Sequence, residues 1–311
     1  MAIVAAALAA IGSNSSAQAE LPGMGFLPVS QPGARGSYEA GPFTSGNQTR
    51  DLRDEGVITP AKHQGSCGAC WAFAAITCVE TACLLSDPSL DAATFDLSEQ
   101  QLISCDTEVW ELEFGSTRNY GCQGGSAVTF EYMRRYGIAT EASYPYTSGG
   151  GSSGTCPAAA PEPSGWQVLE WDFVRPDAGV PSVTELKDAL DAHGAIWVGF
   201  VVYEDFLDDS DECFWYDAAP GEIYRHTSGD RVGAHAVALI GYDDLQGCWI
   251  AKNSWGEAAG PAEDGTFRIA YESNCSFGLN AAWASVGYFG APSPALDTTW
   301  GGLKLLFADR D

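Results

Sequence analysis

A run of small and aromatic residues in the first quarter of the chain restricts the fold more than any other segment. It reads Gln64-Gly65-Ser66-Cys67-Gly68-Ala69-Cys70-Trp71-Ala72-Phe73-Ala74. Glycines followed by alanines and aromatic residues are typical of a loop that turns sharply into a buried helix. Cys70 would then lie at the helix N-terminus, where unpaired N–H groups and the helix dipole favour a thiolate. Because the thiolate is the reactive form of cysteine, this run predicts a nucleophile at the start of a helix.

A cysteine nucleophile needs a base and a group that orients the base, and the chain has only four histidines. His235 stands in an apolar, β-branched run, residues 232–242, which is typical of a buried strand. A second apolar run, residues 249–252, is followed by Asn253. An asparagine oxygen that accepts one imidazole N–H fixes the tautomer and leaves the other ring nitrogen for Cys70.

Further motifs follow one another along the chain. They are Gly56–Gly65, Leu97–Leu102, Gly121–Gly125, Tyr144–Tyr146 and the segments around His235 and Asn253. The run Cys67-Gly68-Ala69-Cys70-Trp71 also has the form C-G-[SA]-C-[WY], which surrounds the catalytic cysteine of papain and the cathepsins. From about Arg50 to Tyr288, the chain therefore resembles the papain (cathepsin-like) family of cysteine peptidases.

The resemblance implies an α+β, papain-like fold of two lobes. A helical left lobe and an antiparallel, β-barrel-like right lobe would have the active-site cleft between them. It also implies a cysteine-type endopeptidase that forms a covalent thioester acyl-enzyme. Cys70 would be the nucleophile, His235 the base and acid, and Asn253 the residue that orients the imidazole. Gln64 and the Cys70 N–H would form the oxyanion hole.

The same resemblance implies contacts, crosslinks and partners. The residues that would contact the substrate are Gly124, Gly125, Ala234 and Trp255. Disulfides Cys67–Cys122 and Cys105–Cys156 would crosslink the helical lobe. The implied partners are peptide or protein substrates and protein inhibitors of cysteine peptidases. The enzyme would be a monomer without a metal or other cofactor.

Two alternatives fit the same residues. Cys67-Gly68-Ala69-Cys70 is also a C-x-x-C motif, so a thiol–disulfide oxidoreductase that uses Cys67 and Cys70 is one alternative. No thioredoxin-like βαβ unit is evident, and Cys122 offers Cys67 another partner, which disfavours this function. A peptide ligase or transpeptidase would use the same catalytic residues and pass the acyl group to an amine instead of water.

The ends of the chain predict how it is processed. Residues 1–19 combine an apolar stretch with an Ala17-Gln18-Ala19 cleavage pattern, as in a secretory signal peptide. Residues 20–49 form a short N-terminal extension or pro-segment without a long amphipathic helix, so a full inhibitory propeptide of the usual kind is not expected. The peptidase domain is expected over residues 50–290, with a helical lobe at about 60–165, a β lobe at about 166–290 and a tail over residues 291–311. Export would lead to an extracellular or a lysosomal or vacuolar location.

Ten cysteines fit an exported protein. If Cys70 is free, at least one more cysteine is unpaired or pairs between chains. We expect one bridge among Cys213, Cys248 and Cys275, but none between Cys78 and Cys83, which project differently from one predicted helix. The formal net charge of −26 argues against nucleic acid and anionic membranes as partners, and it suggests work at low pH, where carboxylates partly protonate.

Periodicity and end signals predict the main elements. We expect helices over residues 71–86, 98–104, 127–136 and 182–192, and strands over residues 196–203, 235–242, 248–252 and 266–271. His193 precedes Gly194 at a helix end, where a partly charged imidazole would suit the dipole. Ala259 stands where the family has a second tryptophan, and insertions at residues 105–121 and 204–216 are expected to alter access to the cleft.

Overall fold

A computed structural model describes residues 23–29, 48–112, 115–158, 161, 163–208 and 213–290. The predicted signal peptide, most of the N-terminal extension and the C-terminal tail lie outside the described residues. The helices are α1 (Cys70–Ser86), α2 (Glu99–Cys105), α3 (Thr129–Tyr136), α4 (Val183–His193) and α5 (Phe214–Asp217), with 3-10 turns η1 (Gly121–Gln123) and η2 (Ser148–Gly150). The strands are β1 (Thr49–Asp51), β2 (Trp110–Leu112), β3 (Gly115–Thr117), β4 (Trp166–Phe173), β5 (Ile196–Tyr203), β6 (Ile223–Tyr224), β7 (Arg231–Asp243), β8 (Cys248–Lys252), β9 (Thr266–Ala270) and β10 (Leu279–Tyr288).

The strands form one large sheet and one small hairpin, so the fold is mixed α+β. The large sheet has the order β4-β10-β5-β7-β8-β9-β6, with β1 added to β7, and β2 pairs with β3. Its pairs are antiparallel except for β6 with β9. The pairs among the described strands form an open path, so the structure does not show the predicted barrel closure.

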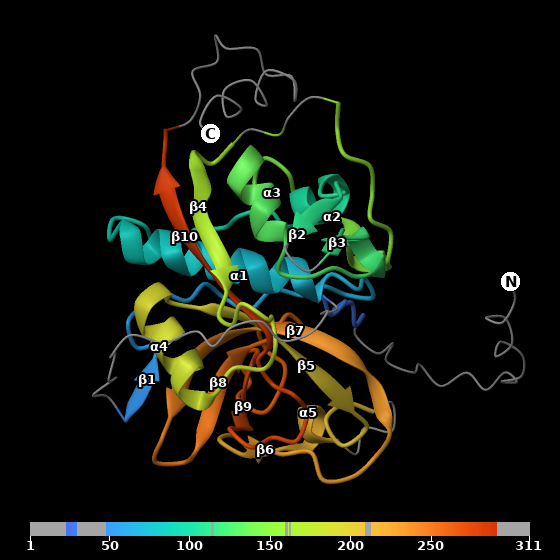
Figure 1. The fold of residues 1–311 in the computed structure, drawn as a ribbon, viewed down its shortest axis with the longest axis vertical. Helices are drawn as coiled ribbons and strands as arrows, with labels where there is room; N and C mark the ends of the chain where they lie inside the picture. The colour runs from blue at the N-terminus through green and yellow to red at the C-terminus, as the bar shows by residue number, and fades with distance from the viewer. Residues whose placement is uncertain are drawn as a thin grey trace, which may run out of the picture.

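Helix α1 crosses the centre of the molecule, between the other helices of the upper half and the sheet of the lower half (Figure 1). Every residue from Cys70 to Leu84 is buried, which explains why the helix has no polar face. It ends at Ser86, as the sequence predicts, and Asp87 after it has an extended backbone. The helix that carries Cys70 is therefore held by packing on all of its sides.

Side-chain caps fix the starts of two shorter helices. At α4, Ser182 and Glu185 form a complete capping box. At α2, the Ser98 hydroxyl accepts from the Gln101 N–H, but the Gln101 side chain accepts from the Ala139 N–H instead, so the capping box is only half formed. His193 ends α4 as expected, yet its ring stacks on Trp283, and burial lowers the pKa of its imidazole. This environment disfavours the partly charged imidazole that we expected there.

Buried apolar side chains form two clusters. One joins α1, α2 and α3 to β4 and β10, and the other joins α4 to β5, β7, β8 and β9. The disulfides Cys67–Cys122 and Cys105–Cys156 both belong to the helical half, with the pairing that the resemblance implies.

The bridge expected in the sheet half is absent from the structure, which corrects that prediction. Cys213, Cys248 and Cys275 are all free and buried, as are Cys78 and Cys83 on α1. The sulfur of Cys275 contacts the Ser273 hydroxyl at 3.2 Å, and that of Cys248 faces Arg268 at 3.8 Å. These thiols pack as small apolar side chains with polar neighbours rather than as crosslinks.

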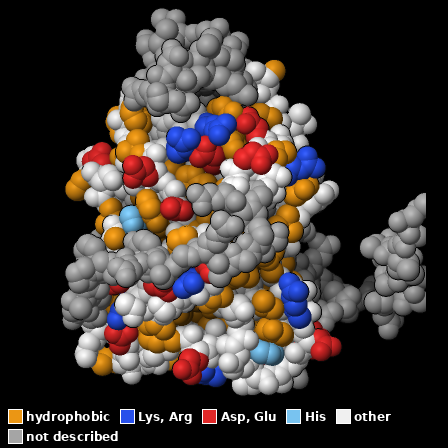
Figure 2. Space-filling view, in the orientation of Figure 1, with side chains coloured by type: hydrophobic (Ala, Val, Ile, Leu, Met, Phe, Trp, Pro, Cys, Tyr) orange, Lys and Arg blue, Asp and Glu red, His pale blue; other side chains and the backbone are white. Residues whose placement is uncertain are grey.

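Charged side chains are interspersed with apolar ones on the face shown in Figure 2. Acidic groups appear singly or beside Lys and Arg there, and they form no continuous patch. Within the described ranges, no helix is both long and apolar enough to cross a membrane.

Candidate active site

Cys70 is the first residue of α1, as the sequence predicts. The loop before it is held by the Cys67–Cys122 disulfide and by a bond of 3.1 Å from the Trp71 indole N–H to the Gly121 carbonyl. Because Cys67 pairs with Cys122, Cys70 is left as a free thiol. This pairing contradicts an oxidoreductase that would use a Cys67–Cys70 dithiol.

His235 on β7 and Asn253 just after β8 are brought together by the antiparallel pairing of these two strands. The His235 Nε2 and the Asn253 Oδ1 are 2.7 Å apart. The same oxygen accepts from the Ser254 N–H at 2.8 Å, which fixes the direction of the amide. Since the oxygen accepts, Nε2 donates and Nδ1 keeps its lone pair. The arrangement predicted for the base and its orienting residue is thus present.

The catalytic candidates meet where α1 contacts β7. The Ala236 N–H, next to His235 in the chain, donates to the Cys70 sulfur over 3.4 Å. Gln64 lies beside them, and its Oε1 accepts from the Ser254 hydroxyl at 2.6 Å. This bond points the Gln64 Nε2 to the other side, where it donates to the Cys67 carbonyl at 2.8 Å and to the Gly23 carbonyl.

Aromatic rings cover the His235–Asn253 bond. The Trp255 ring lies 4.5 Å from the His235 ring and is 3% exposed, so water has no direct path to the bond. Trp215 packs edge-to-face on Trp255 at 4.9 Å. A Cβ at Gly260 would lie 2.6 Å from the Trp215 ring, so this ring fills the space beside Ala259. Trp215 comes from the predicted insertion, and sequence reasoning missed it because only the fold brings it to Trp255.

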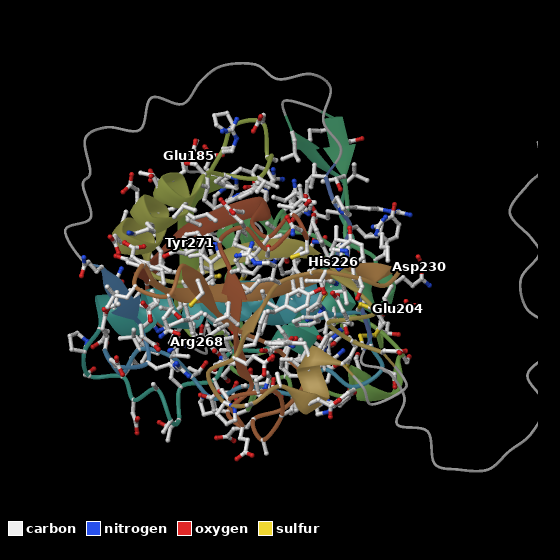
Figure 3. The ribbon with its side chains drawn as sticks, turned by 90° about the horizontal axis from the view of Figure 1, so that it is seen from below. Glu185, Glu204, His226, Asp230, Arg268 and Tyr271 are labelled. Carbon is white, nitrogen blue, oxygen red and sulfur yellow. A yellow bond between two sulfur atoms is a disulfide. The ribbon has the colours of Figure 1, made fainter. Side chains whose placement is uncertain are left out.

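One carboxylate of the insertion joins it to residues 224–227. Asp205 accepts from the Tyr224 hydroxyl at 2.7 Å, from the Thr227 N–H at 2.7 Å and from the His226 ring at 3.0 Å. The His226 ring also stacks on Tyr203. His226 lies near Glu204 and Asp230 on one side of the sheet half in Figure 3. These bonds give His226 a structural role and hold α5 and its Trp215 against the sheet.

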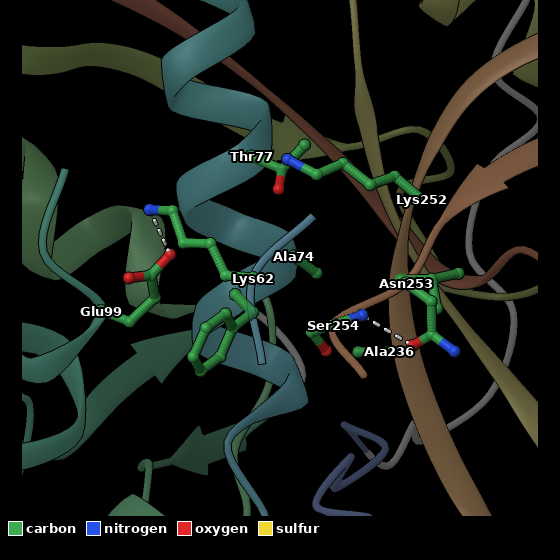
Figure 4. Close-up of a pocket in the computed structure, with 10 residues that line it drawn as sticks. Lys62, Ala74, Thr77, Glu99, Ala236, Lys252, Asn253 and Ser254 are labelled. Carbon is green, nitrogen blue, oxygen red and sulfur yellow. Dashed lines mark hydrogen bonds and ion pairs between the residues drawn. The ribbon is translucent and has the colours of Figure 1, made fainter. Parts of the chain in front are cut away.

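A buried charge cluster connects the two halves near the site (Figure 4). Lys62 contacts Glu80 of α1 at 3.0 Å and Glu99 of α2 at 2.8 Å. On the sheet side, Lys252 donates to Thr59 at 2.9 Å, and Thr59 donates to Glu80. The cavity between these groups measures only about 10 Å³, too small for a substrate. Because Lys252 precedes Asn253, the cluster supports the strand end that orients His235.

An N-terminal segment, residues 23–29, lies across the catalytic residues, and we call it the strap (blue, beside the right-hand end of α1 in Figure 1). Its N–H groups donate to Gly65, Ala234 and Gly125, and the Gly125 N–H donates to Gly25. Gly125 and Ala234, two of the residues expected to contact the substrate, thus hydrogen-bond the strap. Gly124 lies against the strap as well, whereas Trp255 packs on His235 instead.

Cys70 and His235 are both completely buried, and the Gly25 N–H of the strap bonds the Cys70 sulfur. Burial raises the pKa of the Cys70 thiol to about 11, although the N–H groups of Ala236 and Gly25 oppose the shift. Burial also lowers the pKa of His235 to about 4, against the effect of its bond to Asn253. With the strap in place, the thiolate expected at a helix N-terminus is therefore disfavoured, because desolvation outweighs the local N–H groups.

The chain is similar to known cysteine proteases. The family model described as "Papain family cysteine protease" matches residues 46–286. The chain is 32% identical to cathepsin B-like CP3 of Giardia intestinalis over 77% of this chain and 73% of the relative. It is 31% identical to a senescence-specific cysteine protease of Arabidopsis thaliana over 84% of this chain and 71% of the relative.

A solved structure shares the fold. The bromelain protease from Ananas comosus, in complex with the E64 inhibitor, superposes with a TM-score of 0.57 at 27% identity. The match covers 77% of this chain and 99% of bromelain.

Proposed function

Because the chain belongs to the papain family of cysteine proteases, and is thus a hydrolase, we propose that it is an endopeptidase with Cys70 as the nucleophile. The observation that carries this assignment is the 2.7 Å bond between His235 and Asn253. It lies beside Cys70, because Ala236, the residue after His235, donates its N–H to the Cys70 sulfur. Acyl transfer requires a free thiol, an imidazole of fixed tautomer and an amide side chain in one place.

The first chemical step forms a thioester. Cys70 passes its proton to the Nδ1 of His235, and the thiolate attacks the carbonyl carbon of a peptide bond. The carbonyl oxygen becomes an oxyanion, which the Gln64 Nε2 and the Cys70 N–H stabilise. When the tetrahedral intermediate collapses, the carbon–nitrogen bond breaks and His235 protonates the leaving amine.

The second step releases the acyl group. His235 takes a proton from water, and the resulting hydroxide attacks the thioester carbon. The carbon–sulfur bond breaks, the peptide acid leaves and Cys70 regains its thiol. Asn253 holds the imidazole in place through both steps, because its oxygen is fixed by the Ser254 N–H.

A substrate can bind only after the strap has left, so the test needs an open site. A Cβ at residue 25 would lie 1.7 Å from the Gly68 oxygen, so Gly25→Ala is expected to displace the strap. In this background we expect Cys70→Ala to abolish hydrolysis of fluorogenic dipeptides. Cys78→Ala removes another buried thiol of α1 and is expected to leave hydrolysis unchanged. Full activity of the Cys70→Ala chain would overturn the assignment.

We also propose the remaining features of the enzyme from its sequence and relatives. The peptidase domain would span residues 50–290 as two lobes with the active site between them, a proposal that the family match over residues 46–286 supports. Two disulfides favour export through the secretory pathway, to the outside of the cell or to a lysosome or vacuole. Protein sequencing of the secreted enzyme would test for cleavage before Glu20.

A further inference from the structure

His63 lies beside the catalytic candidates, and the thioester mechanism leaves it without a role. It comes directly before Gln64 and forms an antiparallel bridge with Trp255, the residue that covers His235. The Gln64 N–H also donates to the Ser254 carbonyl at 2.9 Å. The main chain of His63 is therefore fixed next to the oxyanion donor and to the aromatic cover of the imidazole.

Neighbouring side chains of this segment point in opposite directions. The Lys62 side chain reaches the buried carboxylates of Glu80 and Glu99. The Gln64 side chain is completely buried, whereas His63 between them is exposed. Such alternation is expected in an extended segment, and it places the His63 imidazole at the surface, at the border of the buried site.

One hydrogen bond fixes the tautomer of the His63 imidazole. Its Nδ1 accepts from the Gly65 N–H at 2.9 Å, so in the neutral ring Nδ1 holds the lone pair and Nε2 carries the hydrogen. Within the described part of the chain, Nε2 has no hydrogen-bond partner. The ring therefore presents a single N–H donor, whose acceptor has to come from solvent or from a ligand.

Small residues adjoin this donor. A Cβ at Gly256 would lie 3.2 Å from the Cδ2 of His63, the ring atom bonded to Nε2, so the ring lies close over the glycine. The same Cβ would lie 3.9 Å from the Cβ of Ala259. Because Ala259 stands where the family has a second tryptophan, no large side chain at that position covers the ring. The donor is thus open to a ligand.

The loop before Cys70 lies between two segments. On one side, the Gly68 N–H donates to the Cys122 carbonyl at 3.0 Å, next to the glycines along which the acyl part of a substrate is expected to lie. On the other side lie His63 and Trp255. Because the two parts of a peptide extend in opposite directions from the scissile bond, the leaving amine would point toward His63.

We propose that His63 is a specificity-determining residue for the part of the substrate that follows the scissile bond. Its Nε2–H donates to an oxygen of the first residue after the cut. This oxygen belongs either to the main-chain carbonyl of a longer peptide or to the terminal carboxylate of a peptide that ends there, and the bond to a carboxylate is the stronger one. The inference rests on the proposed function, since it concerns the substrate of the same site, but binding at His63 does not require catalysis.

Two substrates measure this contact as a ratio. In the Gly25→Ala background, an internally quenched peptide offers a main-chain carbonyl after the cut, whereas a dipeptidyl coumarin amide has none at that position. We expect His63→Ala to lower the ratio of their kcat/KM values, peptide to amide, by about fivefold. His63→Gln keeps an N–H donor and should restore part of the ratio. His193→Ala, which removes the histidine at the end of α4, is the matched control.

A third substrate distinguishes the two acceptors. It has the same sequence but ends in a free carboxylate at the first residue after the cut. A loss of more than about tenfold on this substrate identifies the carboxylate as the preferred acceptor, and an equal loss on both peptides identifies the carbonyl. An unchanged ratio in the His63→Ala chain, or an equal loss on all three substrates, would overturn the proposal.

Nuclear magnetic resonance separates this inference from the proposed function. In the chain with Cys70→Ala and Gly25→Ala, the imidazole signals are followed while the carboxylate peptide is added, and His63→Gln assigns the signal of His63. We expect this signal to shift and that of His193 to stay. If the chain with Cys70 intact hydrolyses no substrate, the shift still supports the contact while the proposed function fails. Normal hydrolysis without a shift overturns the contact and leaves the proposed function intact.

Discussion

The loop that carries Cys70 and the strands that carry His235 and Asn253 are stabilised in different ways. The loop is held by the Cys67–Cys122 disulfide and by the bond from Trp71 to Gly121, whereas β7 and β8 depend on aromatic packing and carry no disulfide among the described residues. A loop has few backbone hydrogen bonds of its own, so crosslinks fix it. A strand in the middle of a sheet is already fixed by its neighbours, and packing then sets the position of its side chains.

The largest expected effect comes from removal of the base. In the Gly25→Ala background, His235→Ala should lower kcat/KM by roughly 10²–10⁴-fold, because proton transfer from Cys70 and to the leaving amine is lost. The control is His193→Ala, since His193 stacks on Trp283 at the end of α4. Equal loss of activity in both variants, measured with a fluorogenic substrate, would show that the histidine effect is not specific to the site.

The next largest effect is expected from Trp215, which packs on Trp255. Trp215→Ala should cost about 3–5 kcal/mol of stability, as is usual for a buried tryptophan, and should also shift the acid limb of the pH–rate profile. Trp249→Ala is the matched control, because Trp249 is equally buried but packs on Tyr271. It should lower the melting temperature without moving the pH profile. If neither variant shifts the pH–rate profile, Trp215 has only a structural role.

In the helical half, loss of the Cys67–Cys122 disulfide should affect the position of the Cys70 loop more than the stability of the fold. Replacing both Cys67 and Cys122 by serine should cost about 2–5 kcal/mol and reduce activity, because the Cys70 loop loses its anchor. Cys105 and Cys156 provide the control, with a similar separation of 51 residues against 55. Denaturation and kinetics of the two double variants would show whether the first bridge has an additional effect on activity.

The pH dependence follows from the burial of His235, which we expect departure of the strap to relieve. In the structure, burial lowers the pKa of His235 from its ordinary value of 6.5 to about 4. Because the imidazole pKa is lower in the buried state than in the open state, the open state is protonated first as the pH falls. Strap binding is therefore strongest above pH 6.5 and weakens as the pH falls toward 4. The Cys70 thiol on α1 is titratable and accepts from the Ala236 N–H next to His235, whereas Phe200, Asn253 and Trp255 around the His235 ring do not titrate. The ratio of hydrolysis rates, parent to Gly25→Ala chain, should rise on acidification, and a constant ratio would contradict this.

The smallest effect concerns the free thiols of the sheet half. Serine in place of Cys213, Cys248 or Cys275 should change stability by no more than about 1–2 kcal/mol each, since no crosslink is lost. Denaturant titration beside the disulfide variants checks this. A loss as large as that of a broken bridge would mean that a third disulfide forms in the protein.

Local signals predicted the elements around Cys70 and Asn253 well. Helix α1 and strand β8 have the expected ends, because a continuous buried run and its flanking residues mark them. Strands β4 and β10 were not expected, since they pair with each other from distant parts of the chain and their sequences alternate weakly. Trp215 and the strap were missed for the same reason: their partners are defined only by the fold.

Labelling of Cys70 tests the central claim most directly. An epoxide that alkylates active-site thiols is incubated with the parent and with the Gly25→Ala chain, and the adduct is mapped by mass spectrometry. We predict one adduct, on Cys70, formed slowly in the parent and much faster in the Gly25→Ala chain, and none after His235→Ala in that background. An adduct on Cys78 or Cys83, or equal labelling of the parent and Gly25→Ala chains, would contradict a Cys70 nucleophile that the strap covers.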